Sequence, residues 1–338
     1  MFVPAIRSSR FCPPRWLTIA IVCCLALLAV RPAGAQQPFE TVGVRALGMG
    51  GAFVAVADDA TANYWNPAGL AGVFFSAVLD VQRTETRRGP DQLSLEGTRD
   101  GATFVSMASP SVGLSYYRIR SFQLDRQEAG QPASLAALVT QHAGLTLVQP
   151  FLPGVTLATV VKVVRGTVAG GLGDGLVSAG DLFAEASALE GPATIRFGLD
   201  VGLMVSLGRA RFGLVGRNLR EPEFASGDGQ VVVLARQLRA GFMIRPTGSL
   251  TLAVDADLST LHTVIGPRRA VAVGAEQQLG RLVVRAGGRV NIEDDRPEPV
   301  GAVGLSLEVM TGLWLDAQLS GGRDEGDQGW GVSTRVGF

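Results

Sequence analysis

Apolar side chains fall on every second position over most of the chain after residue 72. In residues 193–206, one face consists of Ile195, Phe197, Leu199, Val201, Leu203 and Val205. The other face carries Arg196, Gly198, Asp200, Gly202, Met204 and Ser206. A period of two is the period of a β-strand, so one face of such a strand is expected to meet lipid or an apolar core while the other tolerates charge.

Alternating runs of this kind recur along the chain, and many are near ten residues long. A tilted strand needs about ten residues to cross a membrane, whereas strands of soluble domains are usually nearer five or six. About fourteen strands are expected, near residues 73–82, 102–109, 111–120, 137–149, 154–165, 193–206, 209–218, 235–245, 249–258, 268–279, 281–291, 300–309, 312–320 and 329–338.

The connections between these runs alternate between long and short. Residues 83–101 form a long connection, and turn residues such as Pro153-Gly154 occupy the short ones. In outer-membrane barrels, long loops face outward and tight turns face the periplasm. The sequence therefore predicts an all-β fold, a transmembrane antiparallel β-barrel of about fourteen strands over residues 73–338. A secreted β-sandwich or propeller is the alternative, but it would leave the loop alternation a coincidence.

The N-terminus has the composition of a secretory signal peptide. Arg7, Arg10 and Arg15 precede the apolar run Trp16–Val30, and Ala33-Gly34-Ala35 follows it as a small-residue cleavage site. Removal of residues 1–35 by cleavage after Ala35 is expected. The apolar run is shorter than the roughly 20 residues of a membrane-spanning helix, so a retained anchor is the weaker interpretation.

Charge and cysteine content narrow the function classes. Cys12, Cys23 and Cys24 all precede Ala35, so the mature chain is expected to have neither disulfides nor thiolate chemistry. The full chain has 30 basic and 30 acidic residues, and four of the basic ones but no acidic one lie in residues 1–35. The resulting net charge near −4 argues against a nucleic-acid partner. With 44 glycines and only 18% charged residues, the composition suits a membrane barrel.

Candidate catalytic and metal-binding residues are sparse. The histidines are His142 and His262, with Ser134 and Ser259 upstream of them. A barrel lipase that uses serine and histidine is the enzyme to consider, but no nucleophile motif surrounds either serine. We therefore expect no enzyme, no metal site and no cofactor.

Charged residues on the faces away from lipid are expected to form a paired network that fills the barrel lumen and holds the N-terminal segment. A polar conduit or a specific ligand site is the alternative. These residues are Arg196, Asp200, Arg239, Asp255, Asp257, Glu276, Arg285, Arg289, Glu308 and Asp316.

Two further features lie outside the regular strand pattern. Within the 166–192 loop, residues 181–189 are expected to form a helix capped by Asp181, which either folds over the barrel mouth or is a simple loop helix. The chain ends on Phe338, which shares a face with Trp330, Val332 and Val336. A final strand that closes on a C-terminal aromatic resembles the signal read by the barrel-assembly machinery.

Residues 36–72 break the period of two. Gly48, Gly50 and Gly51 would allow unusual backbone conformations and close packing inside a barrel. The acidic pair Asp58-Asp59 could cap a short helix that Pro67 would end. For this pair, a structural role is favoured over direct contact with cargo.

This segment resembles the N-terminal hatch of the FadL-type outer-membrane barrels, and especially the PorV and PorQ branch. The match covers residues 43–72, including Gly48–Gly51, Asp58-Asp59 and the motif Asn66-Pro67-Ala68. The resemblance implies a fourteen-stranded barrel in the cell outer membrane, with residues 36–72 as a hatch or plug and both mature termini in the periplasm.

Two functions follow from the resemblance. The first is a channel that passes hydrophobic small molecules, such as long-chain fatty acids, across the outer membrane, with the surrounding lipids as its other partners. The alternative is a PorV/PorQ-like interaction barrel that docks secreted or surface proteins. Both interpretations make residues 43–70 the segment on which function depends.

Overall fold

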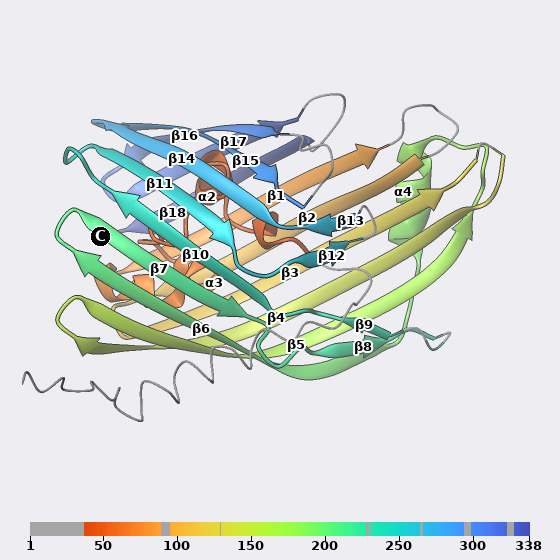
Figure 1. Cartoon of the computed structure of the whole chain (residues 1–338), viewed down its shortest axis with the longest axis horizontal. Coiled ribbons are helices and arrows are strands. Elements are labelled where there is room, and N and C mark those ends of the chain that lie inside the picture. Colours follow the sequence, from red (N-terminus) through yellow and green to blue (C-terminus); the bar gives the residue numbers. More distant parts are fainter. Residues whose placement is uncertain are drawn as a thin grey trace, which may run out of the picture. The chain divides into compact units, whose positions relative to one another are not determined.

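Fourteen antiparallel strands close into a barrel (Figure 1). The structure is a computed structural model that describes residues 37–338 except 89–94, 129, 228, 230, 264–265, 294–298 and 323–327. The proposed signal peptide, residues 1–35, lies outside the described residues. All that follows concerns the described residues from 37 onward. In the described part of the chain, no helix is long and apolar enough to cross a membrane.

The strand prediction is confirmed for all fourteen positions around the barrel. The barrel strands are β1 (Ser76–Arg88), β2 (Leu95–Ala108), β3 (Val112–Arg126), β4 (Ala133–Leu152), β5 (Val155–Gly173), β6 (Ala193–Leu207), β7 (Ala210–Arg217), β10 (Gln237–Ile244), β11 (Leu250–Asp257), β14 (Ala270–Leu279), β15 (Leu282–Asn291), β16 (Val300–Met310), β17 (Leu313–Gly321) and β18 (Gln328–Gly337). β1 pairs with β18 from Ser76 opposite Gly337 to Glu85 opposite Gln328, and this ladder closes the barrel.

The period of two sorts side chains between the two sides of the wall. On β6, Ile195 and Phe197 are exposed on the outer side, while Asp200 is buried on the inner side. On β17, Leu315 and Leu319 are exposed and Asp316 is buried. The outer surface of the barrel therefore presents a band of aliphatic and aromatic residues, as a lipid-facing wall would.

The first five strands are longer than the apolar pattern predicted. β4 and β5 contain 20 and 19 residues, and much of the predicted loops 83–101, 121–136 and 166–192 is strand. The apolar alternation stops at Arg83 on β1 and at Arg118 on β3, where charged residues occupy the outer face. The apolar pattern therefore ends where the apolar band of the outer surface ends, whereas the backbone hydrogen bonds between strands continue beyond that point.

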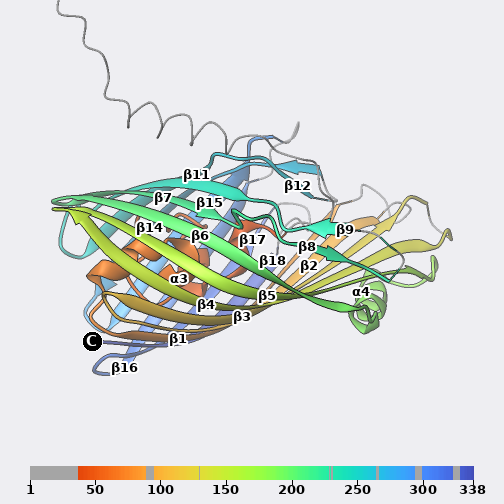
Figure 2. The ribbon, with the colours of Figure 1, turned by 90° about the horizontal axis from the view of Figure 1, so that it is seen from below.

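Helix α4 (Ala179–Ala188) lies where a helix was expected, and of the two alternatives it is the loop helix rather than one over the barrel mouth. Its cap is Ser178, whose hydroxyl accepts from the backbone N–H of Asp181, so the helix begins before the expected residue. Leu182 and Phe183 pack on Leu124 and Leu135. Those two strand residues lie on the outward face, because they share the alternation of exposed Leu114 and Leu145. The helix therefore covers the outside of the strand ends rather than the mouth (Figure 2).

Two short hairpins in the long connections were not predicted: β8 (Glu223–Ala225) with β9 (Val231–Val233), and β12 (Leu261–Thr263) with β13 (Gly266–Arg268). The first hairpin packs into the barrel. Phe224 is fully buried against Leu138, Val164 and Val168, which face inward on β4 and β5. This hairpin therefore narrows the lumen at the end with the long connections.

Candidate functional site

Residues 37–72, here called the inner segment, lie inside the barrel close to the end with the short turns (Figure 1). The segment contains η1 (Phe39–Thr41), α2 (Val44–Gly48), α3 (Ala62–Trp65) and η2 (Pro67–Gly72). It is almost entirely buried. The inner segment thus occupies the lumen as a packed core would.

The matched Asn66-Pro67-Ala68 motif makes the turn between α3 and η2. Pro67 ends α3, as predicted, and also starts η2, while the Asn66 carboxamide oxygen accepts from Ala68 N. The Asn66 amide nitrogen donates to the carbonyl of Val54 and to that of Leu203 on β6. The motif therefore ties one turn of the inner segment both to itself and to the wall.

Glycines on both partners let the inner segment touch the wall directly. A Cβ on Gly50 would lie 2.3 Å from the backbone nitrogen of Gly288 on β15, and one on Gly48 would lie 3.0 Å from Gly304 Cα on β16. Gly50 also has a φ of +69°, which favours glycine. The close approach expected of the Gly48–Gly51 run is therefore present, and the wall supplies matching glycines.

Arg45 on α2 connects the inner segment to itself and to the wall. Its guanidinium contacts Asp58 at 2.6 Å and Asp59 at 2.9 Å, and it makes paired contacts of 2.8 and 2.7 Å with Glu276 on β14. Glu276 also accepts from Arg285 at 2.6 Å. Neither the cap expected of Asp58 nor that of Asp59 forms: Asp59 accepts from Thr61 N, and Thr61 itself precedes α3.

Glu40 is a second anchor. It accepts from Arg239 on β10, and from Arg268 on β13 at 2.8 Å. Arg239 also donates to Asp257 at 2.7 Å. Burial raises the pKa of Glu40, but the charges of Arg239 and Arg268 outweigh burial and hold it well below its ordinary value. The carboxylate is therefore ionised and holds η1 to the wall.

The pKa of Asp59 is lowered in the same way. Burial raises the pKa, but the charges of Arg45 and Arg335 lower it by more than burial raises it. Backbone contacts add to these anchors, since Asp255 on β11 accepts from Phe53 N and Val54 N at 2.8 Å each. Asn63 donates to Ser106 on β2 at 2.7 Å. Polar groups on strands from different parts of the barrel thus hold the inner segment.

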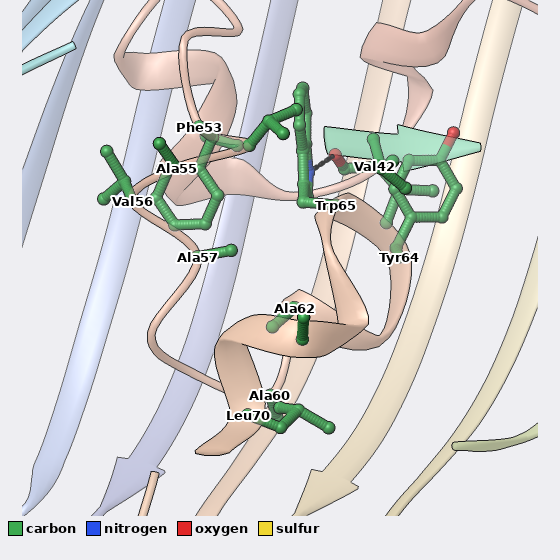
Figure 3. Packing of buried hydrophobic residues seen from close by; sticks show 14 of the residues in the cluster. Val42, Phe53, Ala55, Val56, Ala57, Ala60, Ala62, Tyr64, Trp65 and Leu70 are labelled. Carbon is green, nitrogen blue, oxygen red and sulfur yellow. Dashed lines mark hydrogen bonds between the residues drawn. The ribbon is translucent and has the colours of Figure 1, made fainter. Parts of the chain in front are cut away.

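Aromatic residues, among them Phe53, Tyr64 and Trp65, belong to the buried cluster of the inner segment (Figure 3). Trp65 is fully buried and donates from its indole nitrogen to the Val42 carbonyl at 2.8 Å. Tyr64 packs edge-on against Tyr117 on β3, with ring centroids 5.5 Å apart. The guanidinium of Arg217 on β7 lies 3.5 Å from the Tyr64 ring centroid. At Tyr64, the inner segment therefore presents an aromatic surface to the wall, with the Arg217 cation beside it.

Most of the predicted lumen residues lie in or beside these contacts. Arg239, Asp257, Glu276, Arg285 and Asp316 take part in ion pairs, and Asp255 binds backbone. Arg289 is buried, and its charge acts on Glu40.

Three predicted residues lie elsewhere. Asp200 pairs with buried Lys162 at 2.7 Å, away from the inner segment. Arg196, near the start of β6, is exposed and donates to the carbonyl of Ile195. Glu308 accepts from Gly312 N in a short turn.

The pattern missed Glu40 and Arg45 within the inner segment, Arg217, Arg245 and Arg268 that contact it, and Lys162, which pairs with Asp200 elsewhere in the lumen. Lys162 and Arg217 could have been found, since each falls on the inward face of its strand. Glu40 and Arg45 have no periodic signal because they lie outside the strands.

The histidines occupy different settings. His142 is buried, stacks on Tyr117 with ring centroids 4.3 Å apart, and lies 2.9 Å from the Thr140 hydroxyl, while His262 is exposed on β12. Among the residues that the structure describes, no group of three His, Cys, Asp or Glu side chains is placed to hold a metal ion.

Solved structures share this arrangement of the chain. The toluene transporter TodX of P. putida matches with a TM-score of 0.59 and 13% identity over 89% of this chain and 99% of its own. The CymD monoaromatic hydrocarbon channel matches with a TM-score of 0.61 and 15% identity over 89% and 99%. A Pseudomonas aeruginosa FadL homologue matches with a TM-score of 0.62 and 11% identity over 90% and 100%. The chain has a FadL-type fold.

Comparisons of sequence cover less of the chain than the comparisons of structure do. A family model described as "F plasmid transfer operon, TraF, protein" matches residues 191–257, roughly a fifth of the chain. That stretch runs from the start of β6 to the end of β11. No curated protein sequence matches the chain. At 11–15% identity the structural likeness concerns the fold alone.

Proposed function

We propose that this protein is an outer-membrane channel for hydrophobic small molecules, in which the inner segment acts as a hatch. The observation that carries the proposal is the combination of an apolar outer wall with a lumen filled by a separate, side-chain-anchored segment. Proteins of the same fold, TodX and CymD, are named as a toluene transporter and a monoaromatic hydrocarbon channel. A fully packed lumen passes nothing, so transport requires the inner segment to shift.

Long-chain fatty acids are the cargo that we favour. Cargo that enters from the end with the long connections must displace the β8–β9 hairpin, whose Phe224 is buried against Val164, before it reaches the aromatic surface at Tyr64. Arg217 lies against that surface, and its Nε has no hydrogen-bond partner among the described residues. A guanidinium with a free donor beside aromatic rings suits a carboxylate on an apolar chain. An uncharged hydrocarbon would use the same aromatic surface without the cation.

A reversible cross-link can test the hatch. Cγ2 of Val44 on α2 lies 2.9 Å from the position that a Cβ on Gly331 of β18 would take. In a disulfide, each sulfur lies about 3 Å from the opposite Cβ, so Val44→Cys with Gly331→Cys can form one with little adjustment. The construction is clean because the chain's three cysteines all precede Ala35.

We expect liposomes bearing the oxidised double variant to take up labelled fatty acid no faster than empty liposomes, and the reductant to restore uptake. Val44→Cys alone is the control and should be insensitive to oxidation. Equal uptake by the locked and reduced forms would show that the inner segment is not a hatch. No uptake by the unmodified protein, for either fatty acid or toluene, would remove the channel proposal itself.

An interaction barrel of the PorV/PorQ kind is the second candidate. One observation favours it: the connection after β5 exposes Leu176, and Leu172 is exposed at the end of that strand, far beyond the apolar band. Exposed leucines at a strand tip suit a protein partner. Cross-linking in native membranes followed by mass spectrometry tests this, and the absence of any partner cross-linked near Leu172 would count against it.

A further inference from the structure

The outer face of β2–β5 has a hollow that the proposed channel does not use. This groove has a volume of about 490 Å³. Its sides are outward-facing and exposed: Val105, Met107, Leu114, Tyr116, Leu145, Val161 and Val163. Its floor lies at Ala143, whose small side chain faces outward between Tyr116 and Val163. The groove therefore opens away from the lumen.

Arginines lie immediately past one end of the groove. Along β3 the outward positions are Leu114, Tyr116, Arg118 and Arg120, so the groove residues and the arginines share one face. Along β5 the corresponding positions are Val161, Val163 and Arg165. The strand register places Arg118 opposite Gln141, and Gln141 opposite Arg165. Arg118 and Arg165 thus flank Gln141 about 10 Å apart at the top of the groove.

These arginines carry uncompensated charge. Arg118, Arg120 and Arg165 are exposed, and in the described part of the chain no acidic side chain pairs with any of them. Arg83 and Arg99, on neighbouring strands, do pair, at 3.1 and 2.7 Å with Glu85. Of the acidic residues of α4, Asp181 accepts from Ser178, and Glu185 lies beside Gly173 at the end of β5. The patch therefore has three unpaired positive charges at the edge of an apolar surface.

We propose that this groove binds one phosphate-bearing lipid of the surrounding leaflet, with an acyl chain between β2 and β5 and a phosphate between Arg118 and Arg165. Guanidinium groups bind phosphate oxygens through paired, charge-assisted hydrogen bonds. Basic residues at the level of lipid headgroups are a recurrent lipid-recognition feature. The apolar groove and the arginines together complement both halves of such a molecule. The inference rests on the membrane location within the proposed function, but not on transport.

The occupant is distinguished from other anions by the geometry. A free phosphate would use the arginines and leave the groove empty, since solvent-exposed arginines alone form a weak and salt-screened site. Transported cargo would have to reach the lumen, whereas the groove faces outward. A membrane lipid is the molecule that surrounds this wall at high local concentration.

Native mass spectrometry of the full-length barrel in micelles can test the proposal. The probes are a bisphosphorylated glycolipid and its dephosphorylated form with identical acyl chains. We expect the wild type to retain about tenfold more of the phosphorylated lipid than of the dephosphorylated one, because charge-assisted hydrogen bonds hold the phosphate. Arg118→Gln with Arg165→Gln should lose this preference. Arg209→Gln with Arg281→Gln, exposed arginines at the short-turn end, is the matched control and should keep it.

A second pair of variants tests the groove itself. Ala143→Phe fills the groove, and Ala317→Phe places the same ring on the outward face of β17. We expect Ala143→Phe alone to release the lipid. Equal retention of both glycolipids by a folded wild type, or equal binding by the two arginine double variants, overturns the proposal. The proposal is also overturned if inorganic phosphate displaces the bound lipid as effectively as free phosphorylated lipid does. None of these outcomes depends on uptake, so a barrel that binds lipid but transports nothing would refute only the channel.

Discussion

Arg45 and Glu276 are 231 residues apart in sequence, yet they face each other through paired contacts of 2.8 and 2.7 Å. One residue lies on the short helix α2, and the other on the barrel strand β14. The pair shows that the inner segment is held to the wall by specific side chains rather than by apolar packing alone.

Removal of one partner of this pair should destabilise the barrel strongly. Glu276→Gln leaves Arg45 and Arg285 short of a buried counter-charge, and loss of one partner of a buried pair costs about 3–5 kcal/mol. We expect a lower urea midpoint for unfolding in micelles, read from the heat-dependent gel shift of folded barrels. The double variant Arg45→Met with Glu276→Leu should recover part of the loss. If Glu276→Gln unfolds like wild type, the pair is not an anchor.

Gly50 and Gly280 allow a matched comparison of close packing and backbone strain. Both have a positive φ, +69° and +64°, but a Cβ on Gly280 meets nothing within 4 Å, whereas one on Gly50 would lie 2.3 Å from Gly288 N. Gly280→Ala should cost about 1–2 kcal/mol through strain alone. Gly50→Ala should cost clearly more and should expose the inner segment to protease. Equal unfolding midpoints for the two variants would contradict direct contact between the inner segment and β15.

Acid should loosen the inner segment. The pKa of Glu40 lies below its ordinary value of 4.5, and that of Asp59 below 3.8. A carboxyl with a lowered folded-state pKa stabilises fully above its unfolded value and loses that contribution as pH falls through the folded value. The difference in hydrogen-exchange protection of residues 37–72 between the wild type and Glu40→Gln isolates the Glu40 contribution. This difference should be present at pH 7, stay constant to about pH 5 and shrink in stronger acid. A difference that grows on acidification would contradict the sign.

The C-terminal aromatic can be tested against its structural neighbour. Phe338 stacks on Phe75 with ring centroids 6.4 Å apart, and its backbone nitrogen donates to the Phe75 carbonyl at 3.1 Å. If Phe338 serves as an assembly signal, Phe338→Ala should lower the amount of folded barrel in membranes several-fold, while Phe75→Ala, which removes the same stacking, should have little effect. Similar losses in both variants would assign the effect to packing. Immunoblots of membrane fractions provide the measurement.

Alternation of apolar and polar residues was enough to locate fourteen strands and to assign the two faces of the wall, because side chains of a strand necessarily point to opposite sides. The same rule placed Asp255, Glu276 and Asp316 on the inner face, where Asp255 and Asp316 are buried and Glu276 contacts Arg45. The glycine run in residues 48–51 indicated close packing, since few other residues tolerate it.

The partners of those residues were decided only by the closed barrel. Closure brings β10 and β14 around residues 40–59, and the β12–β13 hairpin lies in the connection between β11 and β14. Glu40 therefore meets Arg239 and Arg268, and Arg45 meets Glu276. It also aligns Arg118 with Arg165 above one groove. No local pattern contains these pairings, because each depends on register and curvature summed over many strands. The sequence by itself determined which side of the wall each residue faces, and the tertiary structure decided what it meets there.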